Sequence, residues 1–315
     1  MINSTNKNQK FSLKATRTVY CYYFPEIREI IDKITKKFPH EIFLQSIEPG
    51  LDNFHTPVIN KFIEYHKSQT PDLKDFENRY YTSGASEGIF HILVKIKTEN
   101  PRAIIYVLKG EYEGYREYGS RIGLKIVAVE KNQDFSKLEP GIFFISNPSA
   151  RDGNIIPNYV INEICKIHKV VFDGTYIGLT KNNLFDLKNK NILAVIFSMS
   201  KPFGLYYYRI GFVFSREKIK TLEANIWFKN ILSLIIADNI LDTIKPQYLY
   251  NKYKPLQKEI IAEINKRENL NLKPSDAILL AYSDKAESLE KFKREDFYRL
   301  CLTPYFLLRE KQNAR

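Results

Sequence analysis

The sequence predicts an α/β protein with a mostly parallel sheet in its larger part and a small α+β part at the C-terminal end. Two observations lead to this prediction. Between residues 81 and 214, short runs rich in β-branched and aromatic residues alternate with segments whose apolar residues have helical spacing. That alternation is typical of a parallel sheet covered by helices. After residue 216 the pattern changes to long helical stretches.

The expected elements follow in order along the chain. Apolar residues at helical spacing predict helices at residues 27–38 and 57–66. Strands are expected at the apolar runs 103–108, 125–129, 141–145, 169–172, 192–197 and 211–214. Helices are expected between these strands at residues 84–97, 112–122 and about 158–168. The chain is then expected to end with two long helices and two short runs, at about 217–244, 248–268, 277–282 and 297–302.

The order of these elements suggests three parts. Residues 46–215 would form the large domain, and residues 216–315 a linking helix and the small C-terminal domain. Residues 1–45 would contribute to the small domain. The first ten residues are polar and hold no apolar core of a secretion signal, so we expect a loose end there.

The composition is that of a soluble globular protein, with 44% hydrophobic and 27% charged residues among 315. No apolar run approaches the roughly 20 residues of a membrane helix. The widely spaced Cys21, Cys165 and Cys301 form neither a disulfide framework nor a zinc pattern, which suits a cytoplasmic location. The five histidines have no metal-ligand spacing, so no metal site is expected.

The net charge of +12 allows two interpretations. A basic protein can bind nucleic acid by neutralising phosphates. Alternatively, the lysines are dispersed over a solvated surface, and this chain has no long basic run and no nucleic-acid signature. We therefore expect no nucleic-acid partner, although the charge would still favour anionic small molecules.

The segment around Lys201 indicates a particular chemistry. Lys201 follows the apolar run 192–197, is flanked by Ser198 and Ser200, and precedes Arg209 by eight residues. A partly buried lysine loses its proton more easily, as imine formation with a carbonyl cofactor requires. The serines and Arg209 would be able to hold a phosphate. Parallel sheets bind ligands at the carboxyl ends of their strands, where this segment is expected.

Residues 198–211 resemble the lysine segment of fold-type I pyridoxal-phosphate (PLP) enzymes, specifically the class I and II aminotransferases, whose pattern is S-x-S-K-x-F-G-L-x-G-x-R-x-G. Only the second glycine differs, being Tyr207. The resemblance covers about residues 81–213 well and the rest loosely. It implies the PLP-dependent transferase fold, with a three-layer large domain, and a Schiff base between the cofactor and Lys201.

Four residues resemble the family's phosphate-binding positions. Gly84 allows close backbone approach, and amides at a helix N-terminus bind phosphate. By resemblance, the backbone of Ala85 and the side chain of Ser86 would contact the PLP phosphate, and Ser198 and Arg209 would complete the site.

Three residues resemble positions that contact the cofactor ring. Tyr112 would stack on the pyridine ring, Asp173 would pair with its protonated nitrogen, and Tyr176 would hydrogen-bond its phenolic oxygen. Lys201 would also act as the general acid/base that moves the substrate's α-proton, with Tyr176 tuning the imine.

Residues 147–153 depart from the family's N-P-x-N-P-T-G segment, whose second asparagine contacts the phenolic oxygen. Counting back from Gly153 places Ala150 at the position of that second asparagine. If the first Asn-Pro is instead the anchor, Asn147 takes the role, and we favour Asn147. Arg151 and Asp152 add charges where the family has Pro-Thr.

Arg299 resembles the arginine that binds the substrate α-carboxylate through paired hydrogen bonds. The segment before it is short, and the helix that usually follows is expected to be nearly absent. The resemblance implies a homodimeric aminotransferase that exchanges an amino group between an amino acid and a 2-keto acid. The alternatives are a PLP-dependent lyase, decarboxylase or oxidase, and a non-catalytic regulator that kept the fold.

Overall fold

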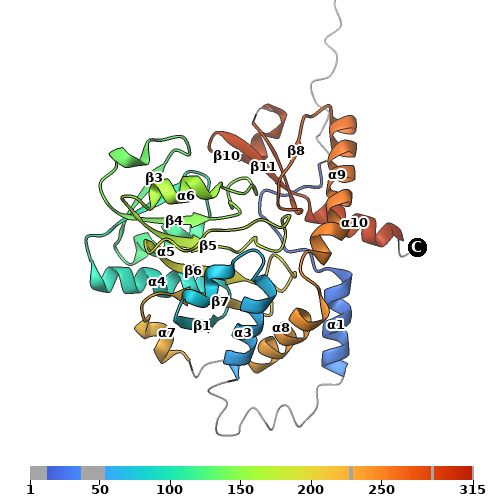
Figure 1. Cartoon of the computed structure of the whole chain (residues 1–315). Helices are drawn as coiled ribbons and strands as arrows, with labels where there is room; N and C mark the ends of the chain where they lie inside the picture. The colour runs from blue at the N-terminus through green and yellow to red at the C-terminus, as the bar shows by residue number, and fades with distance from the viewer. Residues whose placement is uncertain (1–12, 37–53, 227–229, 285–286, 314–315) are drawn as a thin grey trace, which may run out of the picture.

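Figure 1 shows the computed structural model of the chain, which describes residues 13–36, 54–226, 230–284 and 287–313. Within these residues a seven-stranded sheet has the strand order β1-β7-β6-β5-β4-β2-β3. Its strands are β1 (Asn78–Thr82), β2 (Ile104–Leu108), β3 (Lys125–Val129), β4 (Ile142–Ser146), β5 (Lys169–Asp173), β6 (Ile192–Ser198) and β7 (Gly211–Ser215). Strand β7 runs in the direction opposite to the other six strands, so the sheet is mostly parallel as the sequence predicts.

Helices cover both faces of this sheet. The described α-helices are α1 (Pro25–Lys36), α3 (His55–His66), α4 (Ala85–Glu99), α5 (Glu113–Arg121), α6 (Asn158–Ile164), α7 (Lys220–Ala224), α8 (Ile231–Thr243), α9 (Tyr248–Glu268) and α10 (Thr303–Asn313). Successive strand residues point to opposite faces. In β2, Ile105 and Val107 pack in a cluster with α4 and α5, and Ile104 and Tyr106 pack in the larger cluster that includes α3 and α6. Three layers result.

A second, four-stranded sheet lies beside the first, in the order β10-β11-β9-β8. Its strands are β8 (Lys273–Pro274), β9 (Leu280–Ser283), β10 (Lys293–Arg294) and β11 (Phe297–Cys301). In Figure 1, α9 and α10 stand beside this sheet, and Thr16 of the N-terminal segment forms a bridge with Cys301. The larger apolar cluster continues from the first sheet into this part, so one core joins them.

The structure confirms the six expected strands of the large sheet and differs elsewhere. Strand β1 was not anticipated, because its sequence, NRYYT, lacks an apolar run. The single helix expected at 217–244 is replaced by α7 and α8, since Asn230 adopts an extended conformation and its side chain caps Ser233 N–H, which starts a new helix. The sequence predicted almost no helix after Arg299, whereas the structure has α10 there, with 11 residues.

Some expectations cannot be compared with this structure. The boundary expected near residue 45 and the loose end at residues 1–10 lie outside the described residues. Among the residues that are described, none of the helices has the length and apolar character needed to cross a membrane.

Candidate active site

The carboxyl ends of the parallel strands open into a cavity of about 150 Å³. The loops after β2, β4, β5 and β6 each contribute to its wall, as does the N-terminus of α4. The lining residues are Ala85, Ser86, Ile89, Tyr112, Ser146, Ala150, Asp173, Thr175, Tyr176, Ser198, Ser200, Lys201, Tyr206 and Arg209. We call this cavity the central pocket. It brings together eight of the predicted cofactor residues, which lie between residues 85 and 209 of the chain.

One end of the central pocket is suited to an anion. Gly84 precedes α4 with φ +92°, and a β-carbon added there would come within 2.7 Å of the Arg209 guanidinium. Arg209 donates to Ser86 Oγ at 3.3 Å. The amides at the start of α4 and the arginine therefore converge on one place, the arrangement that binds phosphate groups.

Lys201 lies just beyond the end of β6. Its Nζ donates a hydrogen bond to the carbonyl oxygen of Val19, so the N-terminal segment crosses the site. Ser198, at the end of the strand, accepts from Ser200 N–H at 3.1 Å. The turn after β6 thus presents the lysine amine to the central pocket.

Asp173 is a buried carboxylate at the end of β5. It accepts a hydrogen bond from the Tyr115 hydroxyl at 2.7 Å and another from Thr175 N–H at 2.9 Å. Burial raises the pKa of Asp173, and these two donors oppose that rise. Tyr176, one turn further on, is also buried, which raises the pKa of its hydroxyl.

Tyr112 stands at the entrance of the central pocket, where 39% of its surface remains exposed. Its ring packs edge-on against Tyr115, with 5.4 Å between the ring centroids. Gly114 makes room for it, because a β-carbon at that position would lie 2.2 Å from a ring carbon of Tyr112. The ring is therefore held on one side and free on the other.

A second cavity of about 370 Å³ adjoins the central pocket and shares Tyr112, Ala150, Tyr176 and Lys201 with it. Its other lining residues are Arg17, Thr18, Val19, Glu113, Arg294 and Arg299. We call it the arginine pocket.

Arg299 is buried in the wall of the arginine pocket and donates to the carbonyl oxygens of Ala150 and, at 3.1 Å, Arg17. Its Nε has no hydrogen-bond partner among the described residues. Burial and the neighbouring Arg299 guanidinium lower the pKa of Arg294 to about 10. A cavity with such concentrated positive charge favours an anionic ligand.

A still larger cavity, of about 630 Å³, lies at the opposite ends of the strands. There Lys95 is paired with Glu99 and with Glu217, so its cation is already neutralised. The residues predicted to bind the cofactor lie at the other ends of the strands.

The model of the family of class I and II aminotransferases matches residues 30–295. This chain belongs to that family. Among curated relatives, the histidinol-phosphate aminotransferase of Thermoanaerobacter sp. (strain X514) is 25% identical over 223 residues, which cover 65% of this chain and 63% of the relative. The match thus spans less than two thirds of that relative's length.

Solved structures share the fold along nearly the whole chain. Histidinol-phosphate aminotransferase from Sinorhizobium meliloti, in complex with pyridoxal-5'-phosphate, has a TM-score of 0.67 at 14% identity and covers 96% of this chain and 91% of its own. L-threonine-O-3-phosphate decarboxylase from Porphyromonas gingivalis has a TM-score of 0.65 at 14% identity and covers 96% of this chain and 99% of its own. At this identity the likeness concerns the fold.

The segment that departs from the class I and II aminotransferase pattern has a structural role. Asn147 does not line the central pocket, contrary to its predicted role. Its buried carboxamide donates to the Ile156 carbonyl at 2.8 Å and accepts from Ile156 N–H at 2.9 Å. Ala150 faces both pockets instead. The residue of this segment that faces the pockets therefore has a side chain without a polar group.

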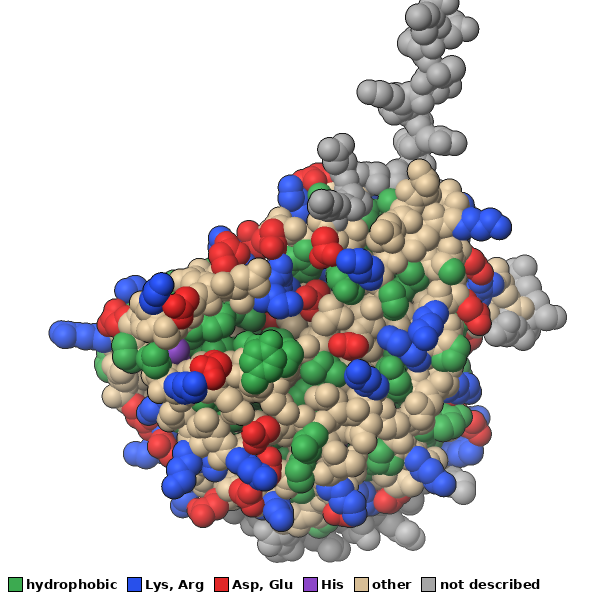
Figure 2. All heavy atoms as spheres, turned by 45° about the horizontal axis from the view of Figure 1, so that its top comes forward, with side chains coloured by type: hydrophobic (Ala, Val, Ile, Leu, Met, Phe, Trp, Pro, Cys, Tyr) green, Lys and Arg blue, Asp and Glu red, His purple; other side chains and the backbone are tan. Residues whose placement is uncertain are grey.

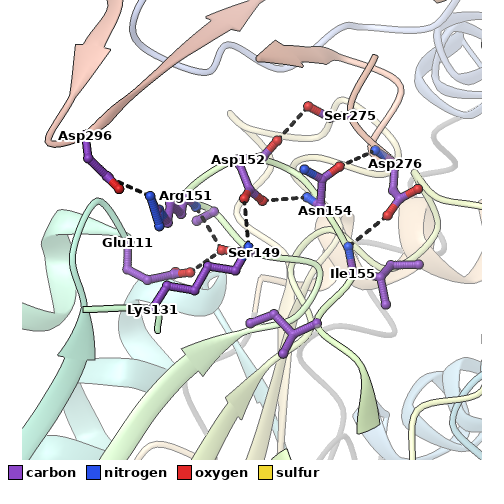
Figure 3. Close-up of polar contacts among 12 residues, drawn as sticks. Glu111, Lys131, Ser149, Arg151, Asp152, Asn154, Ile155, Ser275, Asp276 and Asp296 are labelled. Carbon is purple, nitrogen blue, oxygen red and sulfur yellow. Dashed lines mark hydrogen bonds and ion pairs between the residues drawn. The ribbon is translucent and has the colours of Figure 1, made fainter. Parts of the chain in front are cut away.

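Polar contacts of this segment connect the two sheets. Figure 3 shows Arg151 donating to Asp296, between β10 and β11, at 2.6 Å. Arg151 also lies 4.1 Å from the centre of the Phe297 ring. On the other side Ser275 donates to the Asp152 carbonyl at 2.6 Å. The turn that shapes the central pocket is thus fixed to the small sheet.

Sequence reasoning missed several residues of the site. Arg17 and Arg294 lie far apart in the chain and carry no motif, so only the tertiary structure brings them to one cavity. Glu111 directly precedes Tyr112, but nothing in the sequence shows that it is buried. Thr175 was also missed; like Ser200, which was noted from the sequence, it lines the central pocket with a buried hydroxyl that lacks a partner within the described residues. Its proximity to Asp173 in the sequence was the available signal.

Proposed function

We propose that the central pocket binds PLP and that the protein is an aminotransferase acting between an amino acid and a 2-keto acid. The observation that carries this proposal is the placement of Lys201, Asp173 and the Arg209–Ser86 pair around one cavity of suitable chemistry. Two unpartnered hydroxyls, of Thr175 and Ser200, also point to a polar ligand there. Bound PLP supplies an aldehyde that condenses with amines and a ring that accepts negative charge from the substrate's α-carbon.

The chain's own residues would divide the work as follows. Arg209, Ser86, Ser198 and the backbone at Ala85 hold the phosphate, so the ring enters the pocket in one orientation. Asp173 keeps the ring nitrogen protonated, and the hydrogen bond from Tyr115 orients its carboxylate.

The remaining roles concern the ring face and the reacting carbon. Tyr112 covers one face of the ring. The Tyr176 hydroxyl would donate to the ring's phenolic oxygen, and the side chain of Ala150 would offer no second polar contact there. Lys201 would hold the cofactor and would be the group that moves the proton at the substrate's α-carbon.

The arginine pocket supports an anionic substrate. We propose that Arg299 binds the α-carboxylate and that Arg17 and Arg294 leave room for a second anionic group. The names of the similar proteins, which mention histidinol phosphate and L-threonine-O-3-phosphate, support a phosphate ester as that group. Decarboxylation, or another reaction at the α-carbon, is the second candidate, because Ala150 removes a polar contact that aminotransferases use.

We also propose a homodimer in the cytoplasm. Tyr206 lines the central pocket and Tyr207 follows it with 90% of its surface exposed. Aromatic residues exposed to this degree beside a site support contact with a second copy. Acidic and basic side chains are interspersed on the face shown in Figure 2, which supports small-molecule substrates over nucleic acid.

The cofactor proposal can be tested by reduction. The purified protein should be yellow from bound PLP. Reduction with borohydride should leave the cofactor attached covalently to Lys201. Lys201→Ala should lose covalent attachment. Lys254→Ala is the matched control, because burial lowers the pKa of Lys254 to about 8 although it lies outside the pocket. Covalent PLP in Lys201→Ala would refute the proposal.

The reaction is tested separately by supplying amino acids one at a time. Formation of pyridoxamine phosphate together with a keto acid indicates transamination. Carbon dioxide and an amine without pyridoxamine phosphate would instead indicate the decarboxylase alternative.

A further inference from the structure

Glu111 is a buried carboxyl group with no part in the chemistry described above. It lies on the loop after β2, and only 4% of its surface is exposed. Its two oxygens accept hydrogen bonds from Ser146 and Ser149, which lie at and beyond the end of β4. Figure 3 shows the contact with Ser149. A buried carboxyl group with so specific a set of partners needs an explanation, because burial of such a group is costly.

Each serine passes the interaction on to the backbone. Ser146 Oγ accepts from Ala150 N–H at 2.5 Å, and Ser149 Oγ accepts from Arg151 N–H at 3.2 Å. A hydroxyl has a single hydrogen, so one that donates to a carboxylate keeps its lone pairs for accepting. Glu111 therefore orients both serines toward two successive amides of the turn.

Ser146 binds the amide of Ala150, and the carbonyl group of the same residue binds Arg299. The Ala150 carbonyl oxygen accepts from Arg299 Nη1. A continuous series of hydrogen bonds thus connects Glu111, Ser146, Ala150 and Arg299. Since Ala150 has no polar side chain, backbone hydrogen bonds orient this part of the turn.

We propose that Glu111 is a positioning residue that, through Ser146 and the Ala150 peptide, orients the Arg299 guanidinium for the substrate carboxylate. The inference rests on the proposed function, which makes Arg299 the carboxylate ligand. Arg294 does not substitute for this link. Its guanidinium donates to the backbone carbonyls of Gly110 and Glu111, at 3.2 and 3.1 Å, and not to the Glu111 carboxyl group.

Ligand binding by the holoprotein tests the proposal. The probes are 2-aminoisobutyrate and isopropylamine, which differ by the carboxylate, with dissociation constants measured by calorimetry. Glu111→Gln and Ser146→Ala should each weaken binding of 2-aminoisobutyrate about 10-fold and leave binding of isopropylamine unchanged. The reason is that the series of hydrogen bonds ends at the charged guanidinium of Arg299. Ser149→Ala is the matched control: it removes the other serine and leaves the Ala150 branch intact.

A double variant shows whether Glu111 acts through Arg299 or affects ligand binding in another way. On an Arg299→Lys background, Glu111→Gln should cause no further loss of 2-aminoisobutyrate affinity, since the two residues act on one contact. A full additional loss would contradict the proposal.

A measurement without ligand distinguishes failure here from failure of the proposed function. In NMR spectra of protein labelled with ¹⁵N at arginine, the Arg299 Nε signal is assigned by its absence in Arg299→Lys. Its chemical shift should change in Glu111→Gln and Ser146→Ala but not in Ser149→Ala. An unmoved signal overturns the positioning role. Equal wild-type affinity for both probes, with no effect of Arg299→Lys, would instead overturn the carboxylate role of Arg299.

Discussion

At the scale of single residues, Glu111 shows how its surroundings set the charge of a group. Burial raises the pKa of Glu111 from 4.5 to about 7, and the carboxylates of Asp152 and Asp173 contribute in the same direction. The two serine hydroxyls oppose this rise. Tyr115 also faces the carboxyl group, and Arg294 contacts only the backbone of Glu111. Between about pH 4.5 and pH 7 the folded protein therefore retains a proton that the unfolded chain releases, and above that range the carboxylate accepts from both serines.

This retained proton makes stability depend on pH. Glu111 contributes its full stabilisation below its ordinary pKa, and the contribution disappears as the pH rises through 7. Glu111→Gln has no such dependence. The stability of the variant relative to wild type should rise by about 3 kcal/mol between pH 4 and pH 8, at roughly 1.4 kcal/mol per pKa unit. Urea unfolding at both pH values measures the change.

Glu117→Gln provides the control for this experiment. Glu117 is on α5, and 55% of its side chain is exposed. Its stability difference from wild type should stay nearly constant over the same range. Parallel pH profiles of wild type and Glu111→Gln would contradict the assignment.

At the scale of elements, α5 has two glycines with different functions. A β-carbon at Gly114 would clash with the Tyr112 ring, and one at Gly119 would lie 2.5 Å from Ile126 in the apolar core. Gly114→Ala should therefore weaken PLP binding by up to about 10-fold, because it displaces the stacking ring. Gly119→Ala should lower the melting temperature and leave PLP affinity unchanged.

Absorbance titration with PLP and thermal unfolding of both variants distinguish these effects. The two substitutions are chemically identical and lie on the same helix, so each is the control for the other. Equal PLP affinity in the two variants would show that the Tyr112 ring does not contact the cofactor.

At the scale of the whole molecule, the proposed dimer can be tested at Tyr207. In sedimentation experiments the wild type should have twice the chain mass of 37.0 kDa. Tyr207→Glu should shift the protein toward the monomer, because a charge placed in an apolar contact is desolvated without a partner. Tyr159→Glu is the matched control, since Tyr159 is 69% exposed on α6 and lies outside both pockets. A monomeric wild type that is active would refute the dimer.

Sequence alone determined what depends on local patterns. Apolar runs predicted six of the seven strands of the large sheet, and the segments that follow these strands suggested Lys201, Asp173 and Arg209 as site residues. Lys201, Asp173 and Arg209 line one cavity because strand ends in a parallel sheet meet at one edge. The lysine segment in particular indicated the family, which the match over residues 30–295 confirms.

Tertiary structure alone decided what depends on contacts between distant residues. Asn147 and Ala150 are three residues apart, and only the hydrogen bonds of Asn147 to Ile156 show that it belongs to the turn. The burial of Glu111 and the meeting of Arg17 with Arg294 are likewise invisible in the sequence. The physical reason is that a side chain's charge, partners and exposure are set by neighbours that the fold supplies, and local spacing carries no information about them.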